Sequence, residues 1–153
     1  TSNNDVIEEG IMDSEGNILL AGYQNDGSAA WRVEKISPSG ESIWNYTSDL
    51  NPSQNEYAYD IQEMNDGSYI VLGEDYNGGW VKAAQKISRD GKNVANYTMD
   101  YAGYEAAHGF AQFSNGEFVI VGEGGTNDIV MLTETKPYNS SISVSMGSER
   151  TYE

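Results

Sequence analysis

"DGSYIVLGE", residues 66–74, has two near copies in this chain, "SEGNILLAG" at 14–22 and "SNGEFVIVG" at 114–122. Each copy consists of a turn dipeptide that ends in glycine, a short apolar run and a second glycine. The second glycines are Gly22, Gly73 and Gly122, which recur at a period of about 50 residues. Self-similarity at such a period indicates a repeat architecture, so we expect three copies of one structural unit.

The middle unit predicts four strands, at residues 57–64, 68–74, 80–88 and 93–100. Asn-Asp-Gly and Asp-Gly turns join the first and last pairs, and such turns favour β-hairpins. The run at 68–74 is almost continuously apolar, as expected for a strand buried on both faces. No window predicts a helix. Four-stranded antiparallel units of this length are typical of β-propeller blades, and a β-sandwich or a β-helix explains the period less well.

The predicted fold is therefore all-β, with three four-stranded antiparallel propeller blades. We assign blade 1 to residues 1–50, blade 2 to 51–100 and blade 3 to 101–147, with 148–153 as the start of a further blade or a pairing tail. Three blades are too few to close a ring, so we expect part of a larger one, completed by a longer chain or a second copy. Apolar residues are expected on or near the two open faces: Ile18, Leu19, Leu20, Val119 and Ile120.

The segments "NDGSYIVLGEDYNGGWVKAAQKISRDG" (65–91) and "WRVEKISPSGESIWNYT" (31–47) carry a family resemblance. They resemble the degenerate propeller repeats of bacterial and archaeal secreted and cell-surface proteins, which read loosely D-G-G-Y-I-V-x-G and then W-x-x-K-x-x-x-x-G. The resemblance implies a propeller fold and an extracellular or cell-surface location, but it is poorly specific for activity. The third unit lacks the Trp and the K-I-x-x-x-G segment.

Composition narrows the possible partners. The chain has 24 acidic and 8 basic residues, a formal charge of −16, without the clustered cations that nucleic acid or an anionic membrane surface requires. No stretch approaches the roughly 20 apolar residues of a membrane helix, so we expect no membrane insertion. The absence of cysteine excludes disulfides and thiolate chemistry, and the single histidine, His108, excludes an all-imidazole metal site within one chain.

Candidate catalytic groups are weak. Neighbouring carboxylates at Glu8–Glu9, Asp60–Glu63 and Glu74–Asp75 are better explained as solvated surface than as acid/base pairs. Segments 37–44 and 88–95 resemble the Asp-box turns of sialidase-type propellers but are one residue short. The three arginines, Arg32, Arg89 and Arg150, occupy non-equivalent positions. We therefore predict no catalysis, no metal and no cofactor, with a sialidase-like or lyase propeller as the enzymatic alternative.

The loops between second and third strands and the links between units should share one rim. That rim would carry the predicted ligand-binding residues Tyr23, Asp26, Asp75, Tyr76, Asn77, Tyr101 and Tyr104. Tyrosine with Asp and Asn offers stacking surfaces and hydrogen bonds that suit sugars or protein loops, although such residues also simply build stable loops. The sequence thus favours a non-enzymatic recognition or adhesion module that binds a glycan or protein. The main alternative is a structural module that assembles into a larger propeller or array.

Three N-x-S/T sequons are candidate glycosylation sites, at Asn45, Asn96 and Asn139. The first two lie on the predicted fourth strands, where they should point away from the face that carries Trp44 and Tyr46. A glycan there would cover an exposed strand edge, which otherwise invites aggregation.

Overall fold

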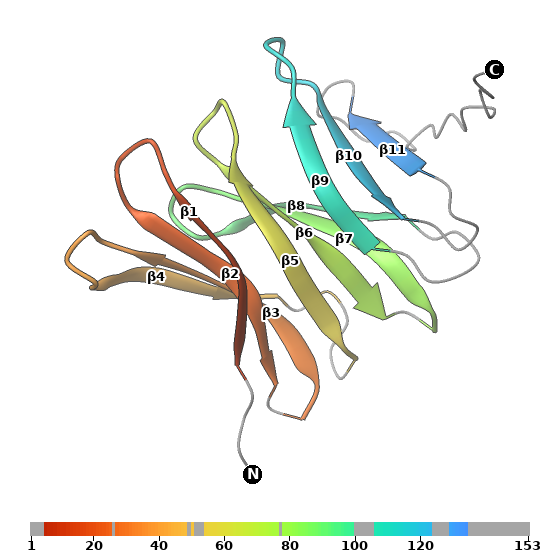
Figure 1. Ribbon diagram of the computed structural model, residues 1–153, viewed down its shortest axis with the longest axis horizontal. Helices are drawn as coiled ribbons and strands as arrows, with labels where there is room; N and C mark the ends of the chain where they lie inside the picture. Colours follow the sequence, from red (N-terminus) through yellow and green to blue (C-terminus); the bar gives the residue numbers. More distant parts are fainter. Residues whose placement is uncertain are drawn as a thin grey trace, which may run out of the picture.

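The computed structural model describes residues 5–25, 27–48, 50, 54–76, 78–99, 106–123 and 129–134. Over these residues it contains eleven strands in three antiparallel sheets and no helix, which confirms the predicted all-β class. Figure 1 shows the three sheets side by side in the order of the chain, with the second sheet between the other two. No helix in the described ranges is long and apolar enough to cross a membrane.

Sheet 1 consists of β1 (Val6–Met12), β2 (Ile18–Asn25), β3 (Ala29–Ile36) and β4 (Ser42–Thr47), paired in that order. Sheet 2 consists of β5 (Glu56–Glu63), β6 (Tyr69–Tyr76), β7 (Trp80–Ile87) and β8 (Asn93–Met99), also in chain order. Sheet 3 contains β9 (Ala106–Gln112), β10 (Phe118–Glu123) and β11 (Ile129–Glu134). The predicted last hairpin of the third unit and residues 148–153 lie outside the described residues.

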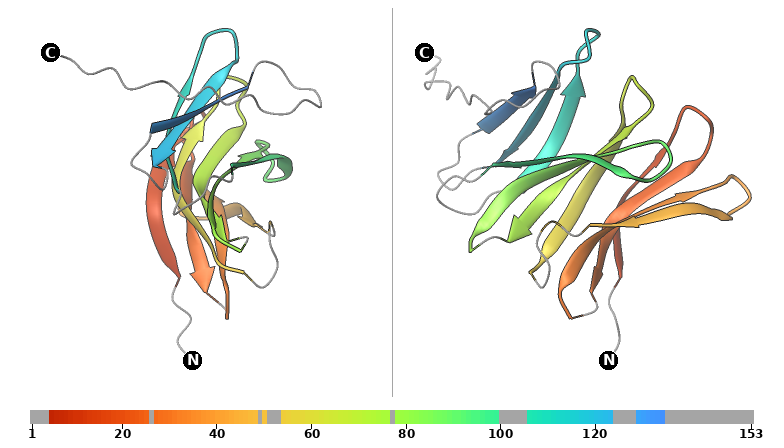
Figure 2. Two further views of the ribbon diagram at one scale, coloured as in Figure 1. Left: turned by 90° about the vertical axis from the view of Figure 1, so that its right-hand side faces the viewer. Right: turned by 180° about the vertical axis from the view of Figure 1, so that it is seen from behind.

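The first strands of the sheets, β1, β5 and β9, are neighbours: β5 packs against β1 on one side and β9 on the other. Figures 1 and 2 show this succession from opposite sides. Each first strand also carries a β-bulge at the same place, at Glu8, Tyr59 and His108. The three sheets therefore repeat one detailed backbone geometry.

The bulge explains why a glycine ends each repeated phrase. Gly73 lies opposite the bulge in β5, and a Cβ there would lie 1.9 Å from the carbonyl oxygen of Tyr57. Gly22 and Gly122 have the same relation to the carbonyl oxygens of Val6 and Ala106, at 1.9 and 2.0 Å. No side chain fits at these distances, so the backbone geometry requires glycine.

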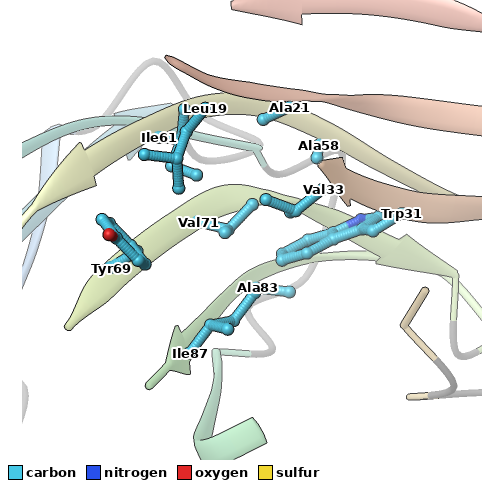
Figure 3. Close-up of a cluster of buried hydrophobic side chains, with 10 residues drawn as sticks. All are labelled: Leu19, Ala21, Trp31, Val33, Ala58, Ile61, Tyr69, Val71, Ala83 and Ile87. Carbon is cyan, nitrogen blue, oxygen red and sulfur yellow. The ribbon is translucent and has the colours of Figure 1, made fainter. Parts of the chain in front are cut away.

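Two hydrophobic cores lie between the sheets, one at each contact. The first joins Leu19, Ala21, Trp31 and Val33 of sheet 1 to Ala58, Ile61, Tyr69, Val71, Ala83 and Ile87 of sheet 2 (Figure 3). The second consists of Met64, Ile70, Leu72, Ala84, Ala107, Phe118 and Ile120. Because β6 contributes to both cores, its first seven residues are all buried, which confirms the prediction for the apolar run at 68–74.

Two residues expected on the open faces lie elsewhere. Leu19 and Ile120 are fully buried in the cores against sheet 2. Their neighbours Ile18, Leu20 and Val119 are half-buried, since alternate residues of a strand point to opposite faces. The expectation for Leu19 and Ile120 was therefore wrong by one position along each strand.

The two sheet–sheet contacts differ in chemistry at the end of the sheets that carries the β1–β2 and β5–β6 turns. In the first contact the Lys35 ammonium lies 2.8 Å from the buried Asp13 carboxylate, and the Tyr69 hydroxyl donates to the same carboxylate at 3.0 Å. In the second contact Met64 occupies the place of Asp13 and Phe118 that of Tyr69, and both are buried in the second core. A polar pair in one contact is thus an apolar pair in the next.

Candidate functional site

Four aromatic side chains form a continuous row at the end of sheets 1 and 2 that carries the β2–β3 and β6–β7 turns, here called the rim. Tyr23 and Tyr57 meet edge to face, with ring centroids 4.7 Å apart. Trp80 follows at 5.5 Å from Tyr57, and Tyr76 at 5.2 Å from Trp80. All four are half-buried, so each keeps part of its surface exposed. We call these residues the aromatic row.

The antiparallel order of the strands produces the row. β2 and β6 run toward the rim and end near Tyr23 and Tyr76, whereas β5 and β7 start there with Tyr57 and Trp80. Tyr76 and Trp80 face each other in the β6–β7 register. The contact between Tyr23 and Tyr57 is the one that crosses from sheet 1 to sheet 2. The row therefore depends on how the two sheets pack.

Only two of the seven predicted binding residues are found in the aromatic row. Tyr23 and Tyr76 belong to the aromatic row, but Asp75 is only 5% exposed and lies within the protein beside it. The remaining predicted residues lie outside the described ranges: Asp26, Asn77, Tyr101 and Tyr104. Sequence reasoning missed Tyr57 and Trp80, although Trp80 directly follows a predicted rim loop and could have been included on that ground.

Asp75 faces another buried acid. Glu56 and Asp75 are partners in the β5–β6 register, and Glu56 is also almost completely buried. Burial, and then the charge of Glu56, raise the pKa of Asp75 to about 6. Within the described part of the chain, Oδ1 of Asp75 has no hydrogen-bond partner. A carboxyl group that takes up a proton near pH 6 therefore lies next to the aromatic row.

Glu74 lies on the opposite face of β6 and takes part in a second cluster. The Tyr59 hydroxyl donates to its carboxylate, and the ring of Tyr59 stacks on His108 of sheet 3 with centroids 5.8 Å apart. The indole nitrogen of Trp31 donates to the Glu74 carbonyl oxygen at 3.2 Å. His108 is exposed. This cluster ties sheet 2 to both neighbours.

A shallow groove of about 200 Å³ adjoins the Tyr23 end of the row. It lies on the face of sheet 1 that points away from sheet 2. Its walls include Val6, Leu20 and Gly22 as apolar or small residues, with Arg32 and Glu34 as charged ones. Arg32 donates to Gln24 at 2.6 Å and lies 3.8 Å from Glu34, so its charge is partly compensated.

The other candidate groups are dispersed. Arg89 lies at the opposite end from the rim, where it pairs with Glu15 at 2.6 Å and Glu63 at 3.2 Å, and Arg32 lies on the outward face of sheet 1. Arg150 is outside the described residues. Glu8 and Glu9 are exposed, in line with a solvated surface, and Asp60 and Glu63 are half-buried. The same expectation was wrong for Glu74 and Asp75, which are only 2% and 5% exposed. Over the described ranges, no three His, Asp or Glu side chains are placed to hold a metal ion.

The sequons at Asn45 and Asn96 lie on β4 and β8, the last strand of each four-stranded sheet. Both asparagines are exposed, whereas Trp44 and Tyr46 alternate with Asn45 and are half-buried. Asn139 lies outside the described residues. The geometry leaves the first two positions open to modification.

No protein-family model matches this chain, and no curated protein matches its sequence. The geometry of the rim is therefore the basis for a functional proposal.

Proposed function

We propose that this chain is a segment of a β-propeller, with its three sheets as blades, and that it recognises a ligand through the rim without catalysis. Three features support the propeller arrangement: the chain-order pairing within each sheet, the adjacency of β1, β5 and β9, and the bulge repeated in each of these strands. Blades arranged around an axis have their first strands innermost and next to one another. The described sheets then form an arc of a larger ring.

The aromatic row carries the proposal for binding. Its four half-buried rings offer apolar faces on which a ligand can stack, as is typical of recognition surfaces. Burial, and then the nearby Tyr23 and Glu74, raise the pKa of Tyr57, so its hydroxyl stays protonated at neutral pH. The row is already assembled by packing between the sheets, so little ordering is needed when a ligand binds.

Charge selects among ligands. With a formal charge of −16, the chain repels anions, and this disfavours sialylated or sulfated glycans. Neutral oligosaccharides stack their sugar rings on tyrosine and tryptophan without that repulsion, and a protein loop with basic residues would be attracted. We therefore infer a neutral glycan or a basic protein loop as the ligand, at an extracellular or cell-surface location. The exposed sequons on β4 and β8 and the resemblance to secreted repeats support this location.

A glycan array with neutral and sialylated oligosaccharides, followed by calorimetry on the best neutral ligand, tests the proposal. Tyr76→Ala should weaken binding at least fivefold, since losing a stacking aromatic commonly costs about 1 kcal/mol or more. Tyr76→Phe should bind within about twofold of the native chain, because it keeps the ring. Ile43→Ala, which truncates an exposed apolar side chain at the start of β4 away from the rim, is the control and should leave affinity unchanged.

Two outcomes would reject this function. Equal affinities for Tyr76→Ala and the native chain would remove the aromatic row from the binding site. Release of shortened oligosaccharides during incubation, followed by chromatography, would favour the enzymatic alternative instead.

A second candidate function is structural assembly into a larger array. The observation that favours it is the exposure of large apolar side chains on the outward faces of sheets 1 and 3, namely Ile7, Met12 and Phe113.

A further inference from the structure

One position, repeated in all three sheets, distinguishes covered faces from open ones. Asp13, Met64 and Phe113 stand just before the first turn of their sheets, where each backbone carbonyl accepts from the turn glycine. Asp13 is 5% exposed and Met64 4%, because the next sheet covers them with Tyr69 and Phe118 respectively. Phe113 is 53% exposed. The outward face of sheet 3 is therefore open at a position that is buried in the other two sheets.

Sheet 1 shows the complementary opening. Ile7, Ala58 and Ala107 are equivalent, since each pairs with the glycine that ends the repeated phrase. Ala58 and Ala107 are fully buried against the preceding sheet, but Ile7 is 65% exposed. Sheet 1 thus exposes a large aliphatic side chain at a position that is buried in sheets 2 and 3, where the preceding sheet covers it.

The last residue of the first strand repeats this pattern. Glu63 accepts from the backbone and hydroxyl of Ser14 in sheet 1, and Gln112 accepts from the backbone of Asn65 in sheet 2. Both residues therefore reach across to the preceding sheet. The equivalent residue of sheet 1 is Met12, which is 73% exposed. A polar bridging residue is replaced here by an apolar one.

The exposed residues on the open faces of sheets 1 and 3 are both apolar, so the two faces are compatible with each other. In the existing contacts Asp13 meets Tyr69, polar with polar, and Met64 meets Phe118, apolar with apolar. Continuing the same geometry from sheet 3 would bring Phe113 against a residue equivalent to Tyr69 and Phe118. The residue of this chain at that position is Ile18. With Met12 next to Ile18 in the β1–β2 register, the open face of sheet 1 is apolar where Phe113 would arrive.

We propose that sheet 3 of one copy packs on sheet 1 of a second copy, with Phe113 against Ile18 and Met12, and that two copies close one ring of six sheets. The contact uses two different surfaces of the chain and occurs twice, so the ring has twofold symmetry and no free face. It continues the geometry of two contacts already present within the chain. Exposed apolar patches of this kind generally mark an interface. The proposal does not depend on the function of the rim.

Sedimentation of the 153-residue chain at micromolar concentration, in salt that screens its charge, is the direct measurement. We expect twice the chain mass and no larger species. Phe113→Asp should weaken the dimer at least about 100-fold, because the ring contains the altered contact twice and each carries a central aromatic. Met12→Lys should act in the same way. Val94→Asp changes an equally exposed apolar residue on β8, away from both open faces, and should remain dimeric.

Mixing the two variants gives the decisive test. A mixed pair contains one unaltered contact and one in which the introduced carboxylate faces the introduced ammonium. Phe113→Asp and Met12→Lys chains, each monomeric alone, should therefore form a one-to-one dimer. Circular dichroism of each variant verifies that it is folded.

Four results would overturn the proposal. The first is that the native chain is a folded monomer with a cooperative melt, and the second is that its mass grows beyond two copies as the concentration rises. The third is that the two variants fail to pair on mixing. The fourth is that the chain folds only when it is joined to further repeats. The last of these would assign the open faces to additional blades of a longer chain.

Discussion

At the scale of single residues, the glycine that ends each repeated phrase is fixed by one steric contact. Gly73→Ala would place a methyl group 1.9 Å from the Tyr57 carbonyl oxygen and also against the ring of Trp31. Relief would require moving the bulge in β5. We expect a loss of about 3 kcal/mol or more in the free energy of unfolding, at the upper end of overpacking costs. Urea denaturation measures this loss.

Gly79→Ala is the matched control for that change. A Cβ at Gly79, in the β6–β7 turn, would have no atom within 4 Å. Its stability should stay within about 0.5 kcal/mol of the native chain, as for most surface substitutions. Similar losses for the two variants would contradict the steric explanation of the repeat.

Asp75 makes stability depend on pH. Its pKa rises from 3.8 in the unfolded chain to about 6 in the folded one, so folding favours the protonated form. The free energy of unfolding should therefore fall as pH rises from about 4 to about 6, and stay lower above that. The difference between the two pKa values corresponds to roughly 3 kcal/mol at full ionisation. Asp75→Asn should remove this dependence.

Thermal melts across this pH range check the prediction. The quantity to compare is the stability of Asp75→Asn minus that of the native chain, measured at each pH. This difference should be larger at about pH 8 than at about pH 4, because only the native chain loses stability when Asp75 ionises. The facing Glu56 is retained in both proteins and serves as a constant background. A difference that does not vary with pH would show that Asp75 is not held in the protonated form by burial.

At the scale of elements, the contact between sheets 1 and 2 depends on Lys35 of β3. Burial alone would raise the pKa of Asp13, but hydrogen bonds from Lys35, Asn17 and Tyr69 hold it well below its usual range. Lys35→Met would leave the buried carboxylate without its cation. We expect a loss of about 3–5 kcal/mol, the usual cost of breaking a buried pair, measured by urea denaturation.

The repeat supplies the control. Lys86 of β7 is the equivalent lysine, and its partner Asp66, 2.7 Å away, is largely exposed. Lys86→Met should therefore cost less than about 1 kcal/mol. Equal losses at the two lysines would mean that the Lys35 pair contributes no more than a surface pair.

The strands were predictable because their signals are local. Turn residues such as Asp66-Gly67 and the apolar run that follows them specify a hairpin without reference to the rest of the chain. The burial of Asp75 was not predictable in this way, because it results from tertiary packing around a strand end that looks polar in sequence. The link from Tyr23 to Tyr57 also depends on the packing of separate sheets. Of the predicted rim tyrosines, Tyr23 and Tyr76 lie in the aromatic row, whereas Tyr57 was not predicted.

At the scale of the whole molecule, the second sheet is the only one of the three that is covered on both faces by described residues. Both cores draw on β6, so this strand should be among the last to open. The first and third sheets each have one face in contact with a neighbour and one that carries exposed apolar side chains. The described residues therefore form two hydrophobic cores, one on each face of the second sheet, rather than one central core.

The difference between the two sheet–sheet contacts has a consequence for how the chain finds its structure. Three near-copies of one unit can pair in the wrong order during folding, and such misassembly is a characteristic failure of repeat proteins. If sheet 3 took the place of sheet 2, Phe118 would cover Asp13 and supply no hydroxyl group. If sheet 2 instead packed on the outward face of sheet 3, Tyr69 would lie against Phe113 and its hydroxyl would lose the Asp13 carboxylate. Each error leaves a buried polar group unsatisfied at about 1–3 kcal/mol, so the correct neighbour is recognised by its chemistry.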